Sequence, residues 1–299
     1  MSSGEGVWSF GYGSNMDMVA LRERKRVEVL EHLPAILGGF RLTFSLQGAN
    51  YVEPAFGGLT REEGAEVHGI AFKMTNESVA QLDRNEGGTS AYRHETVTLT
   101  AYDGRQLEGY VYMPNKAIQE RAEEYLPSSR YLGVLCKGAR QAGLDPAYIE
   151  KLAARPVYSS RDHPEVALAR EGRERARAGL REVGREELLE HKEGVTWVSC
   201  LGFVVSVPTV ANFSSHKGRD MTSRALMQHH GIGLDANDDG GAPPYPLVAS
   251  LSEEELEYIT CWLDYYHVGK GGQLVGFHKE FREQQEQGST DFVLPPIPQ

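Results

Sequence analysis

Apolar and polar positions in the first third of the chain follow a pattern that predicts short β-strands. Alternation indicates that each strand buries one face, because successive side chains point to opposite faces of a sheet. Asp103-Gly104 marks a hairpin turn between the last two strands. The predicted strands cover residues 7–10, 38–44, 66–72, 94–100 and 107–113. Several short strands joined by turn residues favour a small, curved sheet or barrel.

Helical spacing of the apolar residues interrupts this pattern once and then replaces it. Residues 75–82 predict a short helix, with Thr75 or Asn76 as its N-cap. Between residues 116 and 153, apolar side chains recur three and four positions apart. Residues 7–156 are therefore predicted as one α+β domain, a small mixed β-barrel with flanking helices.

A charged segment separates this domain from a second apolar region. Residues 157–194 are dense in Glu and Arg, which is typical of a solvated, largely helical linker. Residues 195–299 hold enough apolar residues for a core and are predicted as an accessory domain, an α/β extension of unrecognised type. The apolar run 195–207 indicates a buried strand pair or one long strand. Helices are predicted at residues 221–230, 252–266 (with a capping box) and 277–287.

Composition and charge narrow the classes of function. The chain of 299 residues has a net charge of -11, which argues against a dedicated nucleic-acid surface. No apolar stretch approaches the ~20 residues that span a bilayer, so no membrane partner is predicted. Three widely spaced cysteines fit a reducing compartment and neither a disulfide framework nor a zinc site. Because the residues after Met1 lack a signal-peptide pattern, a cytoplasmic location is predicted.

The turn after the first strand is a candidate ligand site. Residues 9–15 read Ser-Phe-Gly-Tyr-Gly-Ser-Asn and lead into a helix predicted after Met16. A helix N-terminus presents free N–H groups and the positive end of a dipole, so this turn can hold an anion. Ser14 and Asn15 either cap that helix or direct their polar groups towards the anion. A tight turn with an N-cap explains the same residues without a ligand.

Two further residues are candidates for chemistry. Glu86 follows the short helix and precedes two glycines, and in a partly buried pocket its carboxylate suits general acid–base catalysis. The alternative is an exposed glutamate before a C-cap glycine. Tyr131 follows Pro-Ser-Ser-Arg and can place a hydroxyl in a pocket. Alternatively, it packs as an ordinary tyrosine with its hydroxyl in water.

Taken in order, these motifs resemble those of the gamma-glutamylcyclotransferase family. The resemblance covers about residues 7–154 and rests on three landmarks. They are Gly11-Tyr12-Gly13-Ser14-Asn15, Leu82-Asp83-Arg84-Asn85-Glu86-Gly87, and Pro127-Ser128-Ser129-Arg130-Tyr131 leading into Cys136-Lys137-Gly138-Ala139. It implies a gamma-glutamylcyclotransferase-like barrel and the cyclisation of gamma-glutamyl amino acids to 5-oxoproline, with no metal and no organic cofactor. Asn15 resembles the enzymes that act on gamma-glutamyl amino acids, whereas glutathione-specific and gamma-glutamylamine relatives usually carry Leu there.

The resemblance also implies roles for single residues. Glu86 matches the catalytic glutamate of the family, as general acid and base. Tyr131 matches a substrate-binding tyrosine, and Tyr92 lies one residue away from the position of another. The implied substrate loop consists of Ser9, Phe10, Gly11, Tyr12, Gly13, Ser14 and Asn15. The implied partner is a small gamma-glutamyl molecule.

Alternatives remain open at this level. The same fold serves a cyclotransferase for gamma-glutamylamines or glutathione, or a catalytically silent binding or scaffold protein. Residues 195–299 lie outside the resemblance. Three roles are open for them: a cover over the active site, a homodimer interface, or a surface that docks the chain to a partner.

Three features in the second half imitate functional sites. Residues 235–240 resemble the start of a calcium loop, but Pro246 stands where the bidentate Glu is needed, so an acidic turn is predicted. Adjacent His229 and His230 point in different directions on a helix and do not predict a shared metal. Residues 214–219 combine hydroxyls, a histidine and two bases, which suits an anion site or a solvated loop.

Overall fold

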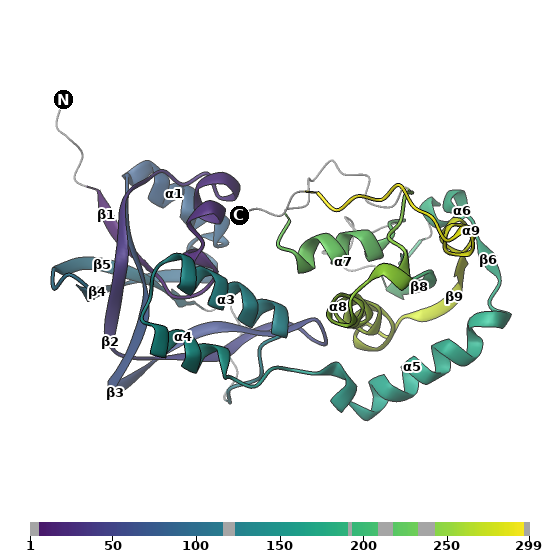
Figure 1. Cartoon of the computed structure of the whole chain (residues 1–299), viewed down its shortest axis with the longest axis horizontal. Helices are drawn as coiled ribbons and strands as arrows, with labels where there is room; N and C mark the ends of the chain where they lie inside the picture. The colour runs from purple at the N-terminus through teal and green to yellow at the C-terminus, as the bar shows by residue number, and fades with distance from the viewer. Residues whose placement is uncertain (1–5, 116–122, 191–192, 209–217, 233–242, 296–299) are drawn as a thin grey trace. The chain divides into compact units, whose positions relative to one another are not determined.

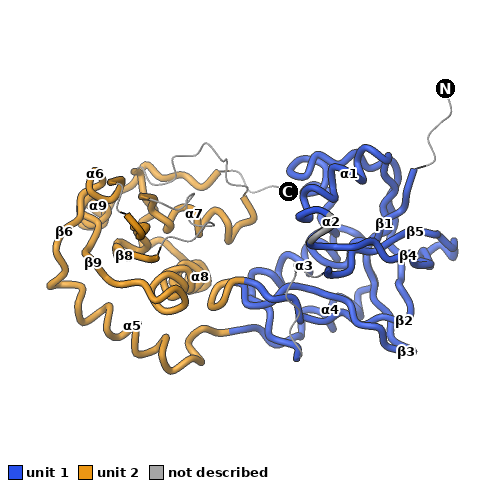
Figure 2. Tube along the Cα trace, turned by 180° about the vertical axis from the view of Figure 1, so that it is seen from behind, with its two compact units in different colours: residues 1–48, 53–158 blue, residues 49–52, 159–299 orange. Residues whose placement is uncertain are grey.

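In the computed structural model the chain folds into two compact units, as Figure 2 shows. The first unit comprises residues 1–48 and 53–158, and the second comprises residues 49–52 and 159–299. The structure describes residues 6–115, 123–190, 193–208, 218–232 and 243–295. Residues 235–240, which carry the predicted acidic turn, and residues 214–217 of the candidate anion patch lie outside this range.

The strands of the first unit close into a barrel in the order β1-β3-β2-β4-β5 (Figure 1). Strand β1 pairs antiparallel with β3 and parallel with β5, so both of its edges are used. The bounds are β1 Val7–Gly11, β2 Val29–Ala49, β3 Glu53–Met74, β4 Tyr92–Ala101 and β5 Gln106–Pro114. The predicted small mixed β-barrel is confirmed.

Strands β2 and β3 are much longer than the alternating segments predicted them to be. They run for 21 and 22 residues. Strand β3 extends through the polar stretch 60–66, where mostly exposed side chains carry no strand signal. Neighbouring strands still pair through their backbone groups, and that pairing does not depend on the side chains.

Helices α1, α3 and α4 begin at side-chain caps. Thr75 caps α1 (Asn76–Asn85), Ser128 caps α3 (Ser129–Gln141), and Asp145 caps α4 (Pro146–Ala153). Each cap accepts a hydrogen bond from one or two backbone N–H groups of the first turn, which have no partner within the helix. The helix predicted from the Thr75 signal is confirmed. Between α1 and β4 lies a single turn, α2 (Gly88–Ala91).

The segment after Met16 is helical but is not the single helix that the sequence predicts. A 3₁₀ turn, Ser14–Met16, comes first, and a π-helical stretch follows at Ala20–Arg24. Neither Ser14 nor Asn15 caps it, so that alternative is wrong. The side chain of Asp17 accepts a hydrogen bond from the Ala20 N–H at 2.9 Å and fills the capping role instead.

The second unit contains a four-stranded sheet in the order β6-β9-β8-β7. Strands β7 and β8 form an antiparallel pair through the turn at Leu201-Gly202, so the apolar run is a strand pair rather than one strand. The strands are β6 Glu182–Val183, β7 Val195–Cys200, β8 Phe203–Pro208 and β9 Gln273–His278. The predicted C-terminal α/β extension is therefore present as a second sheet with helices.

The helices of the second unit follow the sequence signals closely. Helix α8 has the predicted capping box between Ser252 and Glu255. The last helix starts at Lys279 rather than at Phe277, because Phe277 and His278 pair in strand β9. The bounds are α5 Pro164–Ala176, α6 Arg185–Leu189, α7 Met221–His229, α8 Glu253–Asp264 and α9 Lys279–Gln287. Shorter helical turns lie at Ser160–Asp162, Arg177–Gly179, Val248–Ser250 and Tyr265–Gly269.

Buried ion pairs attach α5 to the second unit. Arg173 is 2% exposed and donates to Asp264, which is 0% exposed, at 2.5 Å. Arg170 donates to the other oxygen of Asp264 at 2.7 Å and to Glu257 at 3.0 Å. Residues 159–190, most of the segment predicted as a linker, therefore belong to the second unit.

Within the described part of the chain, no helix is both long enough and apolar enough to cross a membrane.

Asp264→Asn should lower the free energy of unfolding of the second unit by about 3 kcal/mol, because two arginine charges lose their buried counter-charge. Urea unfolding followed by circular dichroism measures the change. Glu174→Gln on α5 is the matched control: Glu174 is 64% exposed and pairs with Arg177 at the surface. It should stay within about 0.5 kcal/mol of the wild type. Equal losses in the two variants would show that the buried pair has no special role.

Candidate active site

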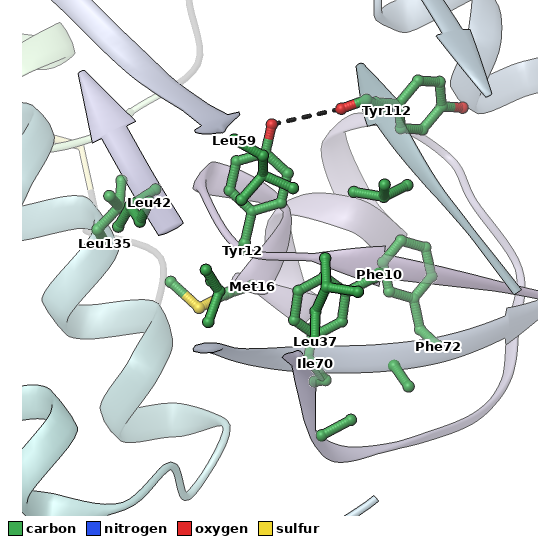
Figure 3. Close-up of a cluster of buried hydrophobic side chains, with 14 of the residues drawn as sticks. Phe10, Tyr12, Met16, Leu37, Leu42, Leu59, Ile70, Phe72, Tyr112 and Leu135 are labelled. Carbon is green, nitrogen blue, oxygen red and sulfur yellow. Dashed lines mark hydrogen bonds between the residues drawn. The ribbon is translucent and has the colours of Figure 1, made fainter. Parts of the chain in front are cut away.

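The turn after β1 is held by its own side chains in the barrel core. Phe10, Tyr12 and Met16 are 2%, 8% and 1% exposed, and Figure 3 shows them among the buried side chains of the barrel. A Cβ on Gly11 would lie 2.7 Å from the carbonyl oxygen of Asn15, so only glycine fits there. These contacts fix the path of the backbone between Gly11 and Asn15.

The inside of this turn offers polar groups that the protein itself does not use. The N–H groups of Gly13, Ser14 and Asn15 take part in no hydrogen bond with any described residue, whereas those of Met16 and Asp17 do. The Ser9 hydroxyl is fully buried and also has no partner among the described residues. Gly13 and Asn15 are half-buried and Ser14 is exposed, so a ligand can reach their N–H groups. The buried Ser9 hydroxyl costs free energy while it has no partner, so a ligand that satisfies it is favoured.

Glu86 is held at the end of α1 by the chain reversal that follows it. Its N–H donates to the Leu82 carbonyl at 2.9 Å, and Gly87 adopts φ of 89°, the left-handed conformation typical of a helix C-terminus. The C-cap glycine of the alternative reading is therefore present. The Glu86 side chain, however, is only 18% exposed, so it is not a solvated surface residue.

Three side chains form a closed cluster around one oxygen of Glu86. Asn15 Nδ2 donates to Glu86 Oε1 at 3.1 Å, and Lys25 Nζ donates to the same oxygen at 2.6 Å. Lys25 Nζ also donates to Asn15 Oδ1 at 2.7 Å. Oε2 of Glu86 makes no hydrogen bond with any residue that the structure describes. The Asn15–Lys25–Glu86 cluster thus joins the turn to the end of α1 and leaves one carboxylate oxygen available.

Tyr131 brings α3 to the same turn. Its hydroxyl accepts a hydrogen bond from the Gly57 N–H at 3.1 Å, and a Cβ on Gly13 would lie 3.4 Å from that hydroxyl. Gly138 lets the helix approach closely, because a Cβ there would lie 2.9 Å from Met16 Cβ. The third sequence landmark therefore packs directly against the first.

Burial and negative charge keep the neighbouring tyrosines protonated. Burial raises the pKa of Tyr131, and the negative charges of Glu53 and Glu86 raise it further. The pKa of Tyr92 is raised by burial and then by the charge of Glu86. Both phenols therefore retain a proton to donate at neutral pH, and both lie within the electrostatic reach of Glu86.

Glu53 supports the start of α3, and the sequence did not indicate it. It is 4% exposed, accepts a hydrogen bond from the Ser128 hydroxyl, and pairs with Arg130 Nε at 2.5 Å. Ser128 in turn caps the N–H of Tyr131 at 2.9 Å. This chain of contacts explains why Ser128 and Arg130 accompany Tyr131 in the motif.

Asp83 fixes the other side of α1. Tyr112 donates its hydroxyl proton to Asp83 Oδ1 at 2.7 Å, and His94 Nε2 lies 2.8 Å from the same oxygen. The Tyr12 hydroxyl donates to the Tyr112 carbonyl at 3.4 Å, drawn as the dashed line in Figure 3. Strand β5 thereby connects the turn with α1 a second time.

The structure thus gathers the predicted site residues around one turn, with one distinction among them. Asn15 and Glu86 belong to the cluster, and Gly13 lies against the Tyr131 hydroxyl. Ser9 lies in β1, opposite Tyr110 of β5. Phe10 and Tyr12 direct their rings into the core, where the two rings stack with centroids 6.4 Å apart. In the described residues, no group of three or more His, Cys, Asp or Glu side chains is arranged to hold a metal ion.

Lys25 is the main residue that the sequence analysis missed. It stands in a run of basic residues, Arg22 to Arg26, and nothing in the run distinguishes it from its neighbours. Its partner Glu86 lies 61 positions away. The backbone carbonyl of Lys25 also accepts from Asn85 Nδ2 at 2.9 Å, which fixes this segment against α1.

The first half of the chain is similar to proteins of known family. The profile of the AIG2-like family matches residues 66–152. The gamma-glutamylcyclotransferase of Bos taurus is 30% identical over 153 residues, which cover 50% of this chain and 78% of the bovine protein. A solved structure of a gamma-glutamyl cyclotransferase is 24% identical and covers 56% of this chain and 99% of its own, with a TM-score of 0.46.

Fungal relatives are longer than the part that matches. The gamma-glutamyl cyclotransferase gliK of Claviceps purpurea is 28% identical over 142 residues, 46% of this chain and 64% of the relative. The chain therefore spans less than two thirds of the length of this relative.

Ser128→Ala should lower the free energy of unfolding by about 1–3 kcal/mol, because α3 loses its N-cap and the buried Glu53 loses a donor. Ser129→Ala, one residue on, is the control; Ser129 is exposed and should tolerate the change. Denaturant unfolding of both variants measures the difference. If Ser128→Ala were as stable as Ser129→Ala, the support of Tyr131 by Glu53 would have no energetic basis.

Proposed function

Because the chain belongs to the gamma-glutamylcyclotransferase family, we propose that its first unit converts gamma-glutamyl amino acids to 5-oxoproline and a free amino acid. The observation that carries the proposal is the hydrogen bond between Asn15 and Glu86. It brings a candidate base to the turn whose N–H groups have no partner, so one site offers both an anion-binding group and a proton acceptor.

The reaction needs a folded substrate and proton transfers at two nitrogens. The alpha-ammonium group of the substrate loses a proton to Glu86, and the freed amine attacks the gamma-carbonyl carbon of the same molecule. The bond between that carbon and the leaving nitrogen breaks, and Glu86 returns the proton to this nitrogen. The ring nitrogen still carries one proton too many, and Glu86 takes this second proton and passes it to the freed amine, which departs as an ammonium ion. Because the nucleophile is intramolecular, the enzyme mainly fixes the conformer and moves protons.

The polar groups of the turn suit the other end of the substrate. The N–H groups of Gly13, Ser14 and Asn15 and the buried Ser9 hydroxyl are donors for the alpha-carboxylate or for the oxygen that gains charge during the attack. The protonated hydroxyls of Tyr131 and Tyr92 are further donors near Glu86. Ser9, Gly13, Ser14 and Asn15 are thus proposed to bind the substrate directly. Phe10, Gly11 and Tyr12 act by fixing the path of the backbone.

The identity of the leaving group and the role of the second half of the chain stay predictions. Gamma-glutamylamines and glutathione are the alternative substrates, and a silent scaffold is the alternative function. Residues 195–299 contain a buried core of their own. Their role as a cover over the active site, a homodimer interface or a docking surface stays a prediction. The cytoplasmic location also stays a prediction.

Glu86→Gln should lower the release of 5-oxoproline from gamma-glutamyl-alanine by at least about 100-fold, because the amide cannot accept the ammonium proton. Glu77→Gln, an exposed position in the first turn of the same helix, is the control and should keep wild-type activity. Chromatographic detection of 5-oxoproline measures both. A wild type that releases none, or a Glu86→Gln variant that releases as much as the wild type, would reject the proposal.

A substrate panel tests the leaving group. With Asn15 in the turn, we expect the highest kcat/KM for gamma-glutamyl-alanine, and lower values for glutathione and for a gamma-glutamylamine. Initial rates of 5-oxoproline release at matched concentrations decide the order. A preference for glutathione or the amine would retain the reaction and replace the proposed substrate.

A further inference from the structure

Lys25 makes contacts that a surface lysine does not need. Its ammonium group donates to Glu86 Oε1 at 2.6 Å and to Asn15 Oδ1 at 2.7 Å, while its side chain is 25% exposed. Arg22, three residues earlier, is exposed and has no ion pair among the described residues. Lys25 therefore loses side-chain conformational entropy in order to occupy a defined position beside Glu86.

Asn15 could not form the same arrangement without Lys25. Its amide group donates through Nδ2 to Glu86, and its Oδ1 then needs a donor to hold the amide plane in this orientation. Lys25 supplies that donor and contacts Glu86 at the same time. Removing the ammonium group leaves Oδ1 and Oε1 each one donor short and frees both side chains to rotate.

We propose that Lys25 is a positioning residue that holds Glu86 Oε1 and Asn15 in place, so that Oε2 alone meets the alpha-ammonium group of the substrate. The inference rests on the proposed cyclotransferase function. In this arrangement the ammonium proton passes to Oε2 and later from Oε2 to the leaving nitrogen. Lys25 itself gains and loses no proton and does not touch the substrate.

The geometry also accounts for the direction of the free oxygen. Oε1 receives two donors, one from the turn and one from the basic segment, so the carboxylate plane is fixed at two points. Asn85 Nδ2 anchors the backbone of Lys25 to α1 at 2.9 Å, which stops the segment from moving away. A displacement of about 1 Å at a reacting group can cost 100-fold in rate, so a fixed carboxylate is worth this support.

Lys25→Met should lower kcat by about 10- to 100-fold with KM changed less than about 3-fold, because the substrate still binds while Glu86 is misplaced. Lys25→Arg should recover part of the loss, since a guanidinium group can also donate to two acceptors. Arg22→Met removes the same charge from the same segment and should retain wild-type kcat. Thermal unfolding of each variant checks that the fold is intact.

Chemical rescue separates positioning from packing. Lys25→Cys should be slow, and alkylation with 2-bromoethylamine should restore kcat, because the product carries an ammonium group at the length of lysine. Alkylation with iodoacetamide should not restore it. Treated wild type is the control: Cys136, Cys200 and Cys261 are buried, and burial raises the pKa of the Cys261 thiol to about 12, so these thiols react slowly.

A double-mutant test shows whether the effect of Lys25 passes through Glu86. In the Glu86→Gln background, Lys25→Met should cause no further loss of the residual rate, because both changes remove one function. If the rate losses of Lys25→Met and Glu86→Gln multiplied in the double mutant, the inference would be overturned. An active wild type together with an unchanged kcat in Lys25→Met would also overturn it. A wild type without activity would overturn the proposed function and this inference together, so the two failures are distinguishable.

Discussion

Strand β1 pairs on both edges, and the candidate site depends on this closure. Ser9 lies opposite Phe72 of β3 on one side and Tyr110 of β5 on the other. A strand held on both edges has no freedom to slide, so the turn that follows it leaves the barrel at a fixed point. The polar groups of that turn then face α1 and α3, which carry Glu86 and Tyr131.

Local signals predicted the elements, and long-range contacts decided the site. Thr75, Ser128 and Ser252 each mark a helix start, because a cap acts within three residues of itself. Glu86 and Asn15 could be singled out from motifs, but their hydrogen bond joins positions 71 apart. The partners Lys25 and Glu53 have no such motif. Their importance comes from what the fold places opposite them, which no local pattern contains.

The same limit explains the segment that the sequence predicts as a linker. Alternating Glu and Arg residues in 164–176 predicted a solvated helix, and most of that helix does face solvent. Val166 and Arg173 are buried, and Arg173 is the unexpected one, because Asp264, 91 positions away, supplies its buried counter-charge. Charge patterning reports how a helix behaves by itself, whereas a buried ion pair depends on two distant positions being brought together.

The pairing of β1 with β5 has a consequence for the order of assembly during synthesis. The Tyr12–Tyr112 hydrogen bond spans 100 positions, and the parallel pairing beside it is equally remote in sequence. During synthesis, the turn after β1 therefore leaves the ribosome long before strand β5, the second pairing partner of β1, has been made. Contacts of such separation form slowly, because a long stretch of chain must first be closed. The turn reaches its final setting only after β5 and α3 have emerged, so binding ability is the last property that the first unit acquires.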